Sequence, residues 1–144
     1  TGLMQLMPAT ASYVSGDSSF EHAAGRQALK DPQTNLTLGQ KYLVQLLNDK
    51  TVGQDLMSLA IAYNAGPGNL AQWKRARGEI DDVLMFIETI PYAETRGFVE
   101  RVLANYWMYR MRLNQETPSL DAVADGRWAR YAAQDDLSMK FASR

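Results

Sequence analysis

The strongest constraint on the fold is an almost unbroken apolar stretch from Leu56 to Tyr63, interrupted only by Ser58. Its length and its few β-branched residues favour a buried helix over a strand. The segment Asn64-Ala-Gly-Pro-Gly follows directly, and its glycines and proline are typical of an abrupt helix end. The sequence therefore predicts a buried helix with a sharply defined C-terminus.

Start and stop signals predict helices along most of the remaining chain. Proline at a first helical turn favours a short helix from Pro8, and Asp31 followed by Pro32 starts a second one that reaches about residue 49. Further helices are expected at 69–77, 82–88 and 93–113, and the glycine- and serine-rich segment 15–26 is expected to be a loop. A tail begins near residue 118, with Trp128 and Tyr131 as its anchors. The predicted fold class is all-α.

The apolar pattern of the long helix at 93–113 predicts which of its faces is buried. Apolar residues recur there at helical spacing, and we expect them to form the buried stripe. They are Phe98, Val102, Leu103, Tyr106 and Met111.

Composition narrows the classes of function. The 144 residues support one domain with a real core, and a net charge of -1 gives no strong attraction to nucleic acid or to an anionic membrane. The absence of cysteine excludes thiol nucleophiles and cysteine-ligated metals, and His22 is the only histidine. No apolar run is long enough to span a bilayer. A neutral polar partner, such as a glycan, fits this balance best.

Four short segments, in one order, carry a resemblance to a known family. They are Thr1-Gly-Leu-Met-Gln-Leu-Met-Pro-Ala-Thr-Ala, Ala62-Tyr-Asn-Ala-Gly-Pro-Gly, Phe86-Ile-Glu-Thr-Ile-Pro and Glu94-Thr-Arg-Gly-Phe-Val. Together they resemble the catalytic domain of soluble lytic transglycosylases, bacterial enzymes of the cell wall. The resemblance is strongest over 1–113, and 114–144 is expected to be a C-terminal tail that packs on or extends the domain.

The resemblance implies a lysozyme-like helical fold, of the goose-type and lytic transglycosylase kind, as a single domain over 1–144. In this family the general-acid glutamate precedes the Gly-Leu-Met-Gln segment. We therefore expect the chain from Thr1 to lack its N-terminal catalytic helix, and to be inactive without that acid.

The segment at 62–68 supplies the first group of candidate site residues. Taken alone, Tyr63 and Asn64 at a helix end followed by Gly-Pro-Gly indicate an ordinary helix stop, with Asn64 as a local cap. The resemblance implies more: the matching tyrosine hydroxyl binds the catalytic glutamate, so Tyr63 supports catalysis. Asn64 and Ala65 are expected to bind substrate.

The N-terminal segment supplies the second group. Gln5 offers donor and acceptor groups that suit a sugar hydroxyl or N-acetyl group, although the segment could equally be a loop that leads into a helix. The resemblance implies that Gln5, Met4 and Met7 line the glycan cleft.

Two glutamates need a decision between structural and catalytic roles. Glu88 follows an apolar run, where desolvation would raise the pKa of a carboxyl group, but such a residue more often reaches solvent from a helix end. The resemblance implies that Glu88 supports the active site without being the principal acid. Glu94 opens the long helix, where a negative charge favours the helix dipole, and we interpret it as architectural, with Phe98 where the family commonly has tyrosine.

The implied reaction is cleavage of the β-1,4 bond between N-acetylmuramic acid and N-acetylglucosamine in peptidoglycan, with a 1,6-anhydro product. It needs no metal or cofactor, its partner is the glycan strand, and its location is the periplasm or cell envelope. Two alternatives stay open: a goose-type lysozyme that hydrolyses the same bond, and a non-catalytic peptidoglycan-binding module of an envelope assembly.

Overall fold

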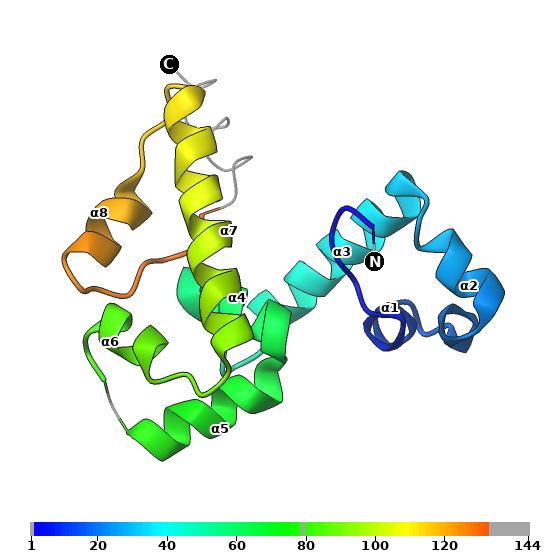
Figure 1. Ribbon diagram of the computed structural model, residues 1–144, viewed down its shortest axis with the longest axis horizontal. Helices are drawn as coiled ribbons and strands as arrows, with labels where there is room; N and C mark the ends of the chain where they lie inside the picture. Colours follow the sequence, from blue (N-terminus) through cyan, green and yellow to red (C-terminus); the bar gives the residue numbers. More distant parts are fainter. Residues whose placement is uncertain (1, 79, 133–144) are drawn as a thin grey trace. The chain divides into compact units, whose positions relative to one another are not determined.

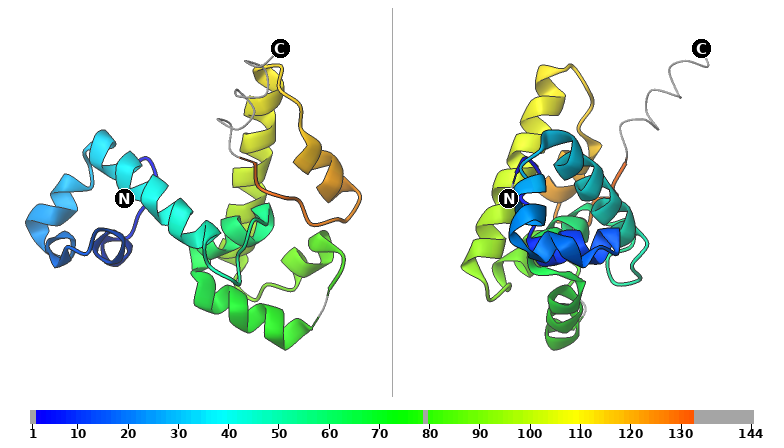
Figure 2. Two further views of the ribbon diagram at one scale, coloured as in Figure 1. Left: turned by 180° about the vertical axis from the view of Figure 1, so that it is seen from behind. Right: turned by 90° about the vertical axis from the view of Figure 1, so that its right-hand side faces the viewer.

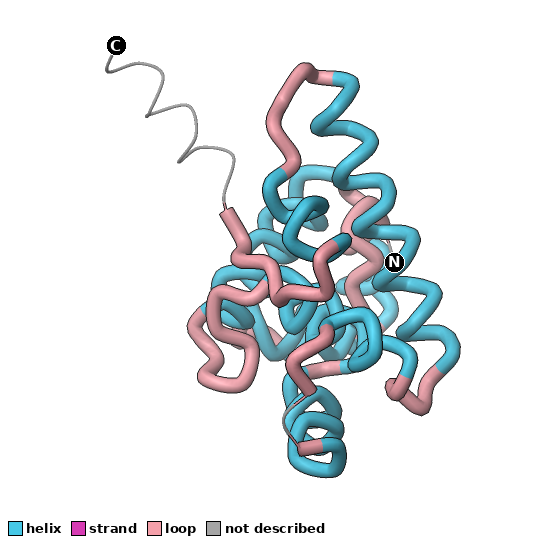
Figure 3. Tube along the Cα trace, turned by 90° about the vertical axis from the view of Figure 1, so that its left-hand side faces the viewer, coloured by secondary structure: helices cyan, strands magenta, loops and turns pink. Residues whose placement is uncertain are grey.

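Helices form the regular structure of the chain in a computed structural model that describes residues 2–78 and 80–132 (Figure 1). Figure 3 shows helices joined by loops over these residues. The β-type pairing among them is one isolated antiparallel bridge between Asp55 and Arg130. The predicted all-α fold class is confirmed. The chain divides after Asn48 into two compact units.

The first unit contains four helical segments. They are α1 (Pro8–Ser15), the 3-10 helix η1 (Ser18–Glu21), α2 (Ala23–Ala28) and α3 (Pro32–Leu47). The start of α3 is the predicted one, since the Asp31 carboxylate accepts a hydrogen bond from the Thr34 backbone N–H at 2.8 Å. Within this unit α1 packs against α3 and η1.

The expectation of a loop at 15–26 was wrong for most of that segment. The Asp17 side chain accepts from the Ser19 N–H at 2.8 Å and starts η1, and α2 follows at once. Gly25 lies so close to η1 that a Cβ there would be 2.2 Å from the Ser19 carbonyl oxygen. The small residues therefore permit capping and close backbone contact, and do not mark an irregular connection.

Asn35 holds the N-terminal segment against α3. Its side chain is completely buried; Oδ1 accepts from the Met4 N–H at 2.7 Å, and Nδ2 donates to the Leu29 carbonyl at 3.0 Å. Gly2, with φ of 74°, lies against the same amide, so that a Cβ would be 2.5 Å from Asn35 Nδ2. One buried amide thus joins three parts of this unit.

Replacing Asn35 with leucine should destabilise the protein by about 2–3 kcal/mol, because the Met4 N–H and the Leu29 carbonyl lose their buried partner. Urea unfolding followed by circular dichroism measures this difference. Gln45→Ala, at an exposed amide of the same helix, is the matched control and should change stability by less than about 0.5 kcal/mol. Equal effects of the two variants would contradict the role given to Asn35.

The second unit is built around α4 (Leu56–Ala65), which packs against α5 (Pro67–Arg77) and α7 (Ala93–Arg112) (Figures 1 and 2). Every residue from Leu56 to Ala62 is buried, as the apolar stretch predicted. Ser58, the polar residue that interrupts this apolar stretch, has a hydrogen-bond partner, since its Oγ accepts from Lys74 Nζ at 2.8 Å. The shorter helices α6 (Val83–Glu88) and α8 (Pro118–Ala124) complete the unit.

The buried face of α7 differs from the predicted stripe. Val102 and Met111 are exposed, and of the predicted residues Leu103 is buried. Polar residues share the buried face: Arg110 donates from Nε to the Glu116 carbonyl at 2.7 Å. The prediction failed because it counted only apolar residues. The buried residues of α7 are Thr95, Val99, Leu103 and Arg110.

The segment after α8 returns to the start of α4. The Leu56 N–H donates to the Ala129 carbonyl at 2.8 Å, and the Tyr131 N–H donates to the Gln54 carbonyl at 2.7 Å. The indole of Trp128 donates to the Ile80 carbonyl at 3.2 Å. Residues 133–144 of the predicted tail lie outside the described residues. In the described ranges, no helix combines the length and apolar character that a membrane crossing requires.

Asp55 caps α4 from a partly buried position. Its carboxylate accepts from the Ser58 N–H at 2.6 Å. Burial raises the pKa of this carboxyl group, although the hydrogen bonds from Ser58 and the charge of Lys74 oppose the shift. Ionisation of Asp55 therefore costs more free energy in the folded than in the unfolded chain.

The upward pKa shift of Asp55 on folding leads to a pH-dependent prediction for Asp55→Asn, which keeps a capping side chain. A folded-state pKa above the unfolded value gives stability that is present at low pH and lost as pH rises through the folded pKa. The asparagine variant, which does not titrate, should therefore gain stability relative to the parent between pH 3 and pH 7. Thermal melts at both pH values measure the gain.

Asp31→Asn is a control of opposite sign. The hydrogen bond from the Thr34 N–H lowers the pKa of the exposed Asp31 carboxyl group. Its ionised form is therefore stabilising, and the stability it contributes is lost as pH falls through the folded pKa. The variant should lose stability relative to the parent between pH 3 and pH 7. The same sign for both variants would contradict the assignment.

Candidate functional site

The sharp turn between α4 and α5 creates the candidate site. Gly66 has φ of 86° and ψ of 151°, a combination open in practice only to glycine, and its N–H donates to the Ala62 carbonyl at 2.8 Å. Pro67 then begins α5 without needing a backbone donor. The end of α4 and the start of α5 are thereby held in a fixed relation.

A pocket of about 280 Å³ lies at this turn. Residues from the end of α4, from α5 and from the start of α7 line it, together with the residue that precedes α7. They are Asn64, Ala65, Asn69, Tyr92, Glu94 and Thr95. The pocket therefore unites the second and fourth sequence motifs, which are far apart in the chain.

Two hydrogen bonds orient the amides of this pocket. Thr95, which is 2% exposed, donates from Oγ1 to Asn64 Oδ1 at 2.8 Å. Asn69 donates from Nδ2 to the Ala65 carbonyl at 2.7 Å. Asn64 Nδ2 can therefore donate to a bound molecule, and Asn69 Oδ1 can accept from one. This arrangement suits a neutral ligand with hydroxyl or amide groups.

Aromatic rings support the pocket from neighbouring positions. Tyr63 stacks on Phe98, with ring centres 6.4 Å apart and planes at 5°. Tyr92, which lines the pocket and is half exposed, meets Trp73 edge to face at 5.2 Å. Phe98, where the sequence lacks the tyrosine common in the family, thus provides an apolar face for Tyr63.

The pocket contains Glu94 and not Glu88 among its lining residues. Glu88 ends α6 with an exposed side chain, whereas Glu94 stands in the first turn of α7. The sequence predicts an architectural role for Glu94 and does not single out Asn69, Tyr92 or Thr95 as site residues. Glu94 and Thr95 belong to the fourth motif, and this position is the sequence signal that could have identified them as site residues.

The N-terminal candidates belong to the first unit. Gln5 is exposed, has a positive φ of 51°, and donates from Nε2 to the Gly2 carbonyl at 2.8 Å. Met7 is 66% exposed. Met4 is partly buried and lies against Gly39, where a Cβ would be 2.6 Å from its Cγ. Gln5 and Met7 are therefore accessible, while Met4 also serves packing.

No group of three or more histidine, cysteine or acidic side chains that could hold a metal ion occurs among residues 2–78 and 80–132. The chemistry that the pocket itself offers is hydrogen bonding by two oriented amides, with one carboxylate from Glu94 beside them.

Comparison with known proteins relates both units to one family. A family model of the transglycosylase SLT domain matches residues 1–86, and one of the soluble lytic transglycosylase helical domain matches residues 89–118. The soluble lytic murein transglycosylase of Salmonella typhimurium is 37% identical over 131 residues, which are 90% of this chain and 19% of that protein. The protein of the same name from Escherichia coli K12 is 37% identical over 128 residues, which are 88% and 19% of the two chains.

A solved structure agrees with these matches. The 70 kDa soluble lytic transglycosylase of Escherichia coli superposes with a TM-score of 0.70 at 36% identity, over 91% of this chain and 21% of that one. The chain thus spans about a fifth of the length of the relatives it matches.

Thr95→Val should remove the hydrogen bond to Asn64 while keeping side-chain volume. We expect a loss of about 1 kcal/mol in stability, typical of one hydrogen bond, and a shift of the Asn64 side-chain amide signals in NMR spectra. Thr95→Ser keeps the hydroxyl and should leave the Asn64 signals in place. Unchanged Asn64 signals in the valine variant would show that Thr95 does not orient the amide.

Proposed function

Because this chain belongs to the transglycosylase SLT domain family, we propose that it binds and cleaves peptidoglycan glycan strands as part of a lytic transglycosylase. The bond cleaved is the β-1,4 linkage from N-acetylmuramic acid to N-acetylglucosamine, and the product carries a 1,6-anhydro ring. The observation that supports this best is the pocket at the α4–α5 turn, which brings together two of the four motifs that carry the resemblance.

The polarity of the pocket fits such a substrate. Asn64 and Asn69 present an oriented donor and an oriented acceptor, which can pair with sugar hydroxyl and N-acetyl groups. Tyr92 adds a partly exposed aromatic surface beside them. A neutral glycan can satisfy these groups without any strongly charged partner, in agreement with the net charge of -1.

The proposed chemistry uses a single acid. A glutamate protonates the glycosidic oxygen, and the same group then accepts the proton of the muramoyl 6-hydroxyl, which attacks C1 and closes the anhydro ring. The family resemblance gives this role to a glutamate that precedes the Gly-Leu-Met-Gln segment. Within the chain, Tyr63 supports that acid, and Gln5, Met4, Met7, Asn64 and Ala65 bind the glycan.

A second carboxylate organises the substrate side of the pocket in this proposal, and its position favours Glu94 for the role. Both glutamates are exposed, but Glu94 lines the same pocket as the hydrogen-bonded Asn64 and Thr95, whereas Glu88 lies outside the lining set. The substrate also implies that the protein works in the periplasm or cell envelope.

The reaction is tested by incubating isolated murein sacculi with the chain and with an N-terminally extended version that supplies the glutamate-bearing helix. We expect anhydromuramoyl fragments, identified by mass spectrometry, from the extended version alone. Fragments with reducing ends would instead indicate a lysozyme-type hydrolase. Binding without release by the extended version would indicate a non-catalytic binding module.

Glu94→Gln and Glu88→Gln, made separately in the extended version, discriminate between the two carboxylates. If Glu94 organises the substrate, its variant should lose about tenfold or more in turnover, which is less than the roughly 10²–10⁴-fold supplied by a general acid or base that transfers the proton itself. Glu88→Gln should then stay within about twofold of the parent. The reverse pattern would restore the supporting role that the sequence suggested for Glu88.

A further inference from the structure

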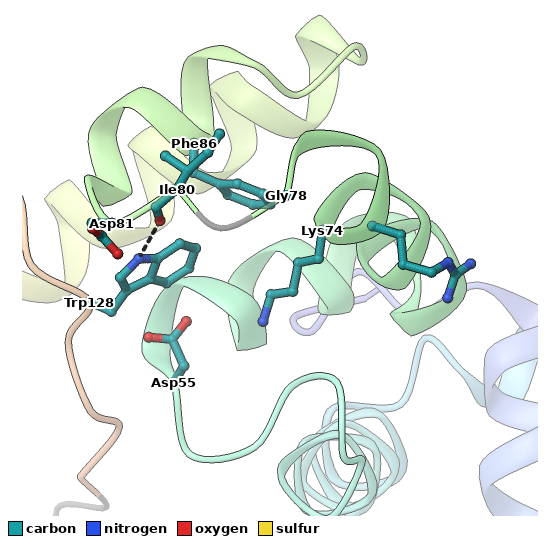
Figure 4. A pocket seen from close by; sticks show the side chains of 8 residues that line it. Asp55, Lys74, Gly78, Ile80, Asp81, Phe86 and Trp128 are labelled. Carbon is teal, nitrogen blue, oxygen red and sulfur yellow. Dashed lines mark hydrogen bonds between the residues drawn. The ribbon is translucent and has the colours of Figure 1, made fainter.

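A larger cavity, of about 620 Å³, lies in the second unit away from the pocket at the α4–α5 turn (Figure 4). The lining residues come from the N-cap of α4, the C-terminal half of α5, α6 with the segment before it, and the segment after α8. They are Asp55, Lys74, Arg75, Gly78, Ile80, Asp81, Phe86 and Trp128. Its volume lies within the range of about 300–1,000 Å³ that small-molecule sites occupy.

This cavity and the pocket of the proposed function lie at opposite ends of α4. Asp55 caps the N-terminus of α4, whereas Asn64 and Ala65 end it. The helix has 10 residues, so its two ends are about 15 Å apart. The two sets of lining residues share no member.

Lys74 reaches into the cavity from α5 with its ammonium group held in place. Nζ donates to the Thr51 carbonyl at 2.9 Å and to Ser58 Oγ at 2.8 Å, and it lies 5.6 Å from the centre of the Trp128 ring. An ammonium group has three donors, so one stays available for a ligand. Burial lowers the pKa of Lys74, and the charge of Asp55 opposes this shift.

Asp55 supplies the opposite charge from a neighbouring wall. Its Oδ1 accepts from the Ser58 N–H at 2.6 Å, and a carboxylate has about four acceptor positions, so it can also accept from a ligand. In the described ranges Asp55 and Lys74 form no ion pair within 4.0 Å, although each senses the charge of the other. Figure 4 shows both side chains directed into the same space below Trp128.

The aromatic wall gives the cavity its apolar part. Trp128 packs on Phe86 with ring centres 5.2 Å apart, and its indole hydrogen bond to the Ile80 carbonyl holds the ring in position. An aliphatic or aromatic group of a ligand can therefore lie on this wall while charged groups meet Lys74 and Asp55.

We propose that this cavity binds a small zwitterion, an amino acid or a short peptide, whose carboxylate meets Lys74 and whose ammonium group meets Asp55. The two fixed charges of opposite sign, separated by open space and bordered by Trp128 and Phe86, carry the proposal. Arg75 and Asp81, both exposed, add one charge of each sign to the lining.

The test uses L-alanyl-L-alanine as probe against the 144-residue chain, with the Trp128 indole N–H followed by NMR. We expect a saturable shift of that signal. The N-acetylated dipeptide and the dipeptide amide, which each lack one charge, should bind about tenfold more weakly, the loss expected for one charge-assisted hydrogen bond. Free alanine is measured in the same way, to decide whether the ligand is an amino acid or a peptide. An affinity equal to that of the dipeptide identifies an amino acid site, and weaker binding identifies a peptide site.

Two variants test which side chain binds which charged group of the ligand. Asp55→Asn, which keeps the helix cap, should remove the discrimination between the free and the acetylated probe. Lys74→Met should remove the discrimination between the acid and the amide. Arg127→Gln, at a side chain that is 67% exposed and outside the lining set, should bind like the parent.

The proposal is overturned if the dipeptide gives no saturable shift, if all three forms bind equally, or if both cavity variants bind like the parent. No glycan takes part in this measurement, so its outcome is independent of the proposed function.

Discussion

The burial of α4 is the constraint on which the second unit depends. A helix that is covered from Leu56 to Ala62 must be surrounded, and α5 and α7 do so directly. The polar groups that this burial traps then need partners: Ser58 binds Lys74, and the first turn is capped by Asp55. Polar side chains and backbone groups without a partner inside the helix therefore lie at both ends of α4, because the apolar helix stops there.

The two ends differ in the kind of chemistry they can support. At the C-terminal end, Gly66 and Pro67 turn the chain so that oriented amides and Glu94 share a pocket. This surface offers hydrogen bonds from oriented amides together with one carboxylate. At the N-terminal end, partial burial raises the pKa of Asp55 and lowers that of Lys74. Partly desolvated charges that form no ion pair with each other favour a ligand that brings charges of its own.

The first unit follows a different principle. Its N-terminal segment is short, and one buried amide, Asn35, and two close contacts at Gly2 and Gly39 help to hold it. These interactions leave Gln5 and Met7 exposed while Met4 packs inward. A segment with the Gly-Leu-Met-Gln pattern can thus present polar and apolar side chains from a backbone that is hydrogen-bonded to α3.

Local signals in the sequence are enough to predict the fold class, most helix boundaries and the family. Apolar spacing, Asp31 before Pro32 and the Gly-Pro-Gly stop are local signals, and local backbone sterics and capping act over a few residues. Within segment 15–26 the sequence prediction missed two local features, the Asp17 cap of η1 and the close approach of Gly25 to Ser19. It also failed where a contact joins distant segments, since the buried face of α7 includes Thr95, whose hydroxyl binds Asn64. The choice between Glu88 and Glu94 in the pocket lining, and the meeting of Asp55, Lys74 and Trp128, were likewise decided by tertiary structure. Such groupings depend on how helices pack, and no spacing along the chain encodes them.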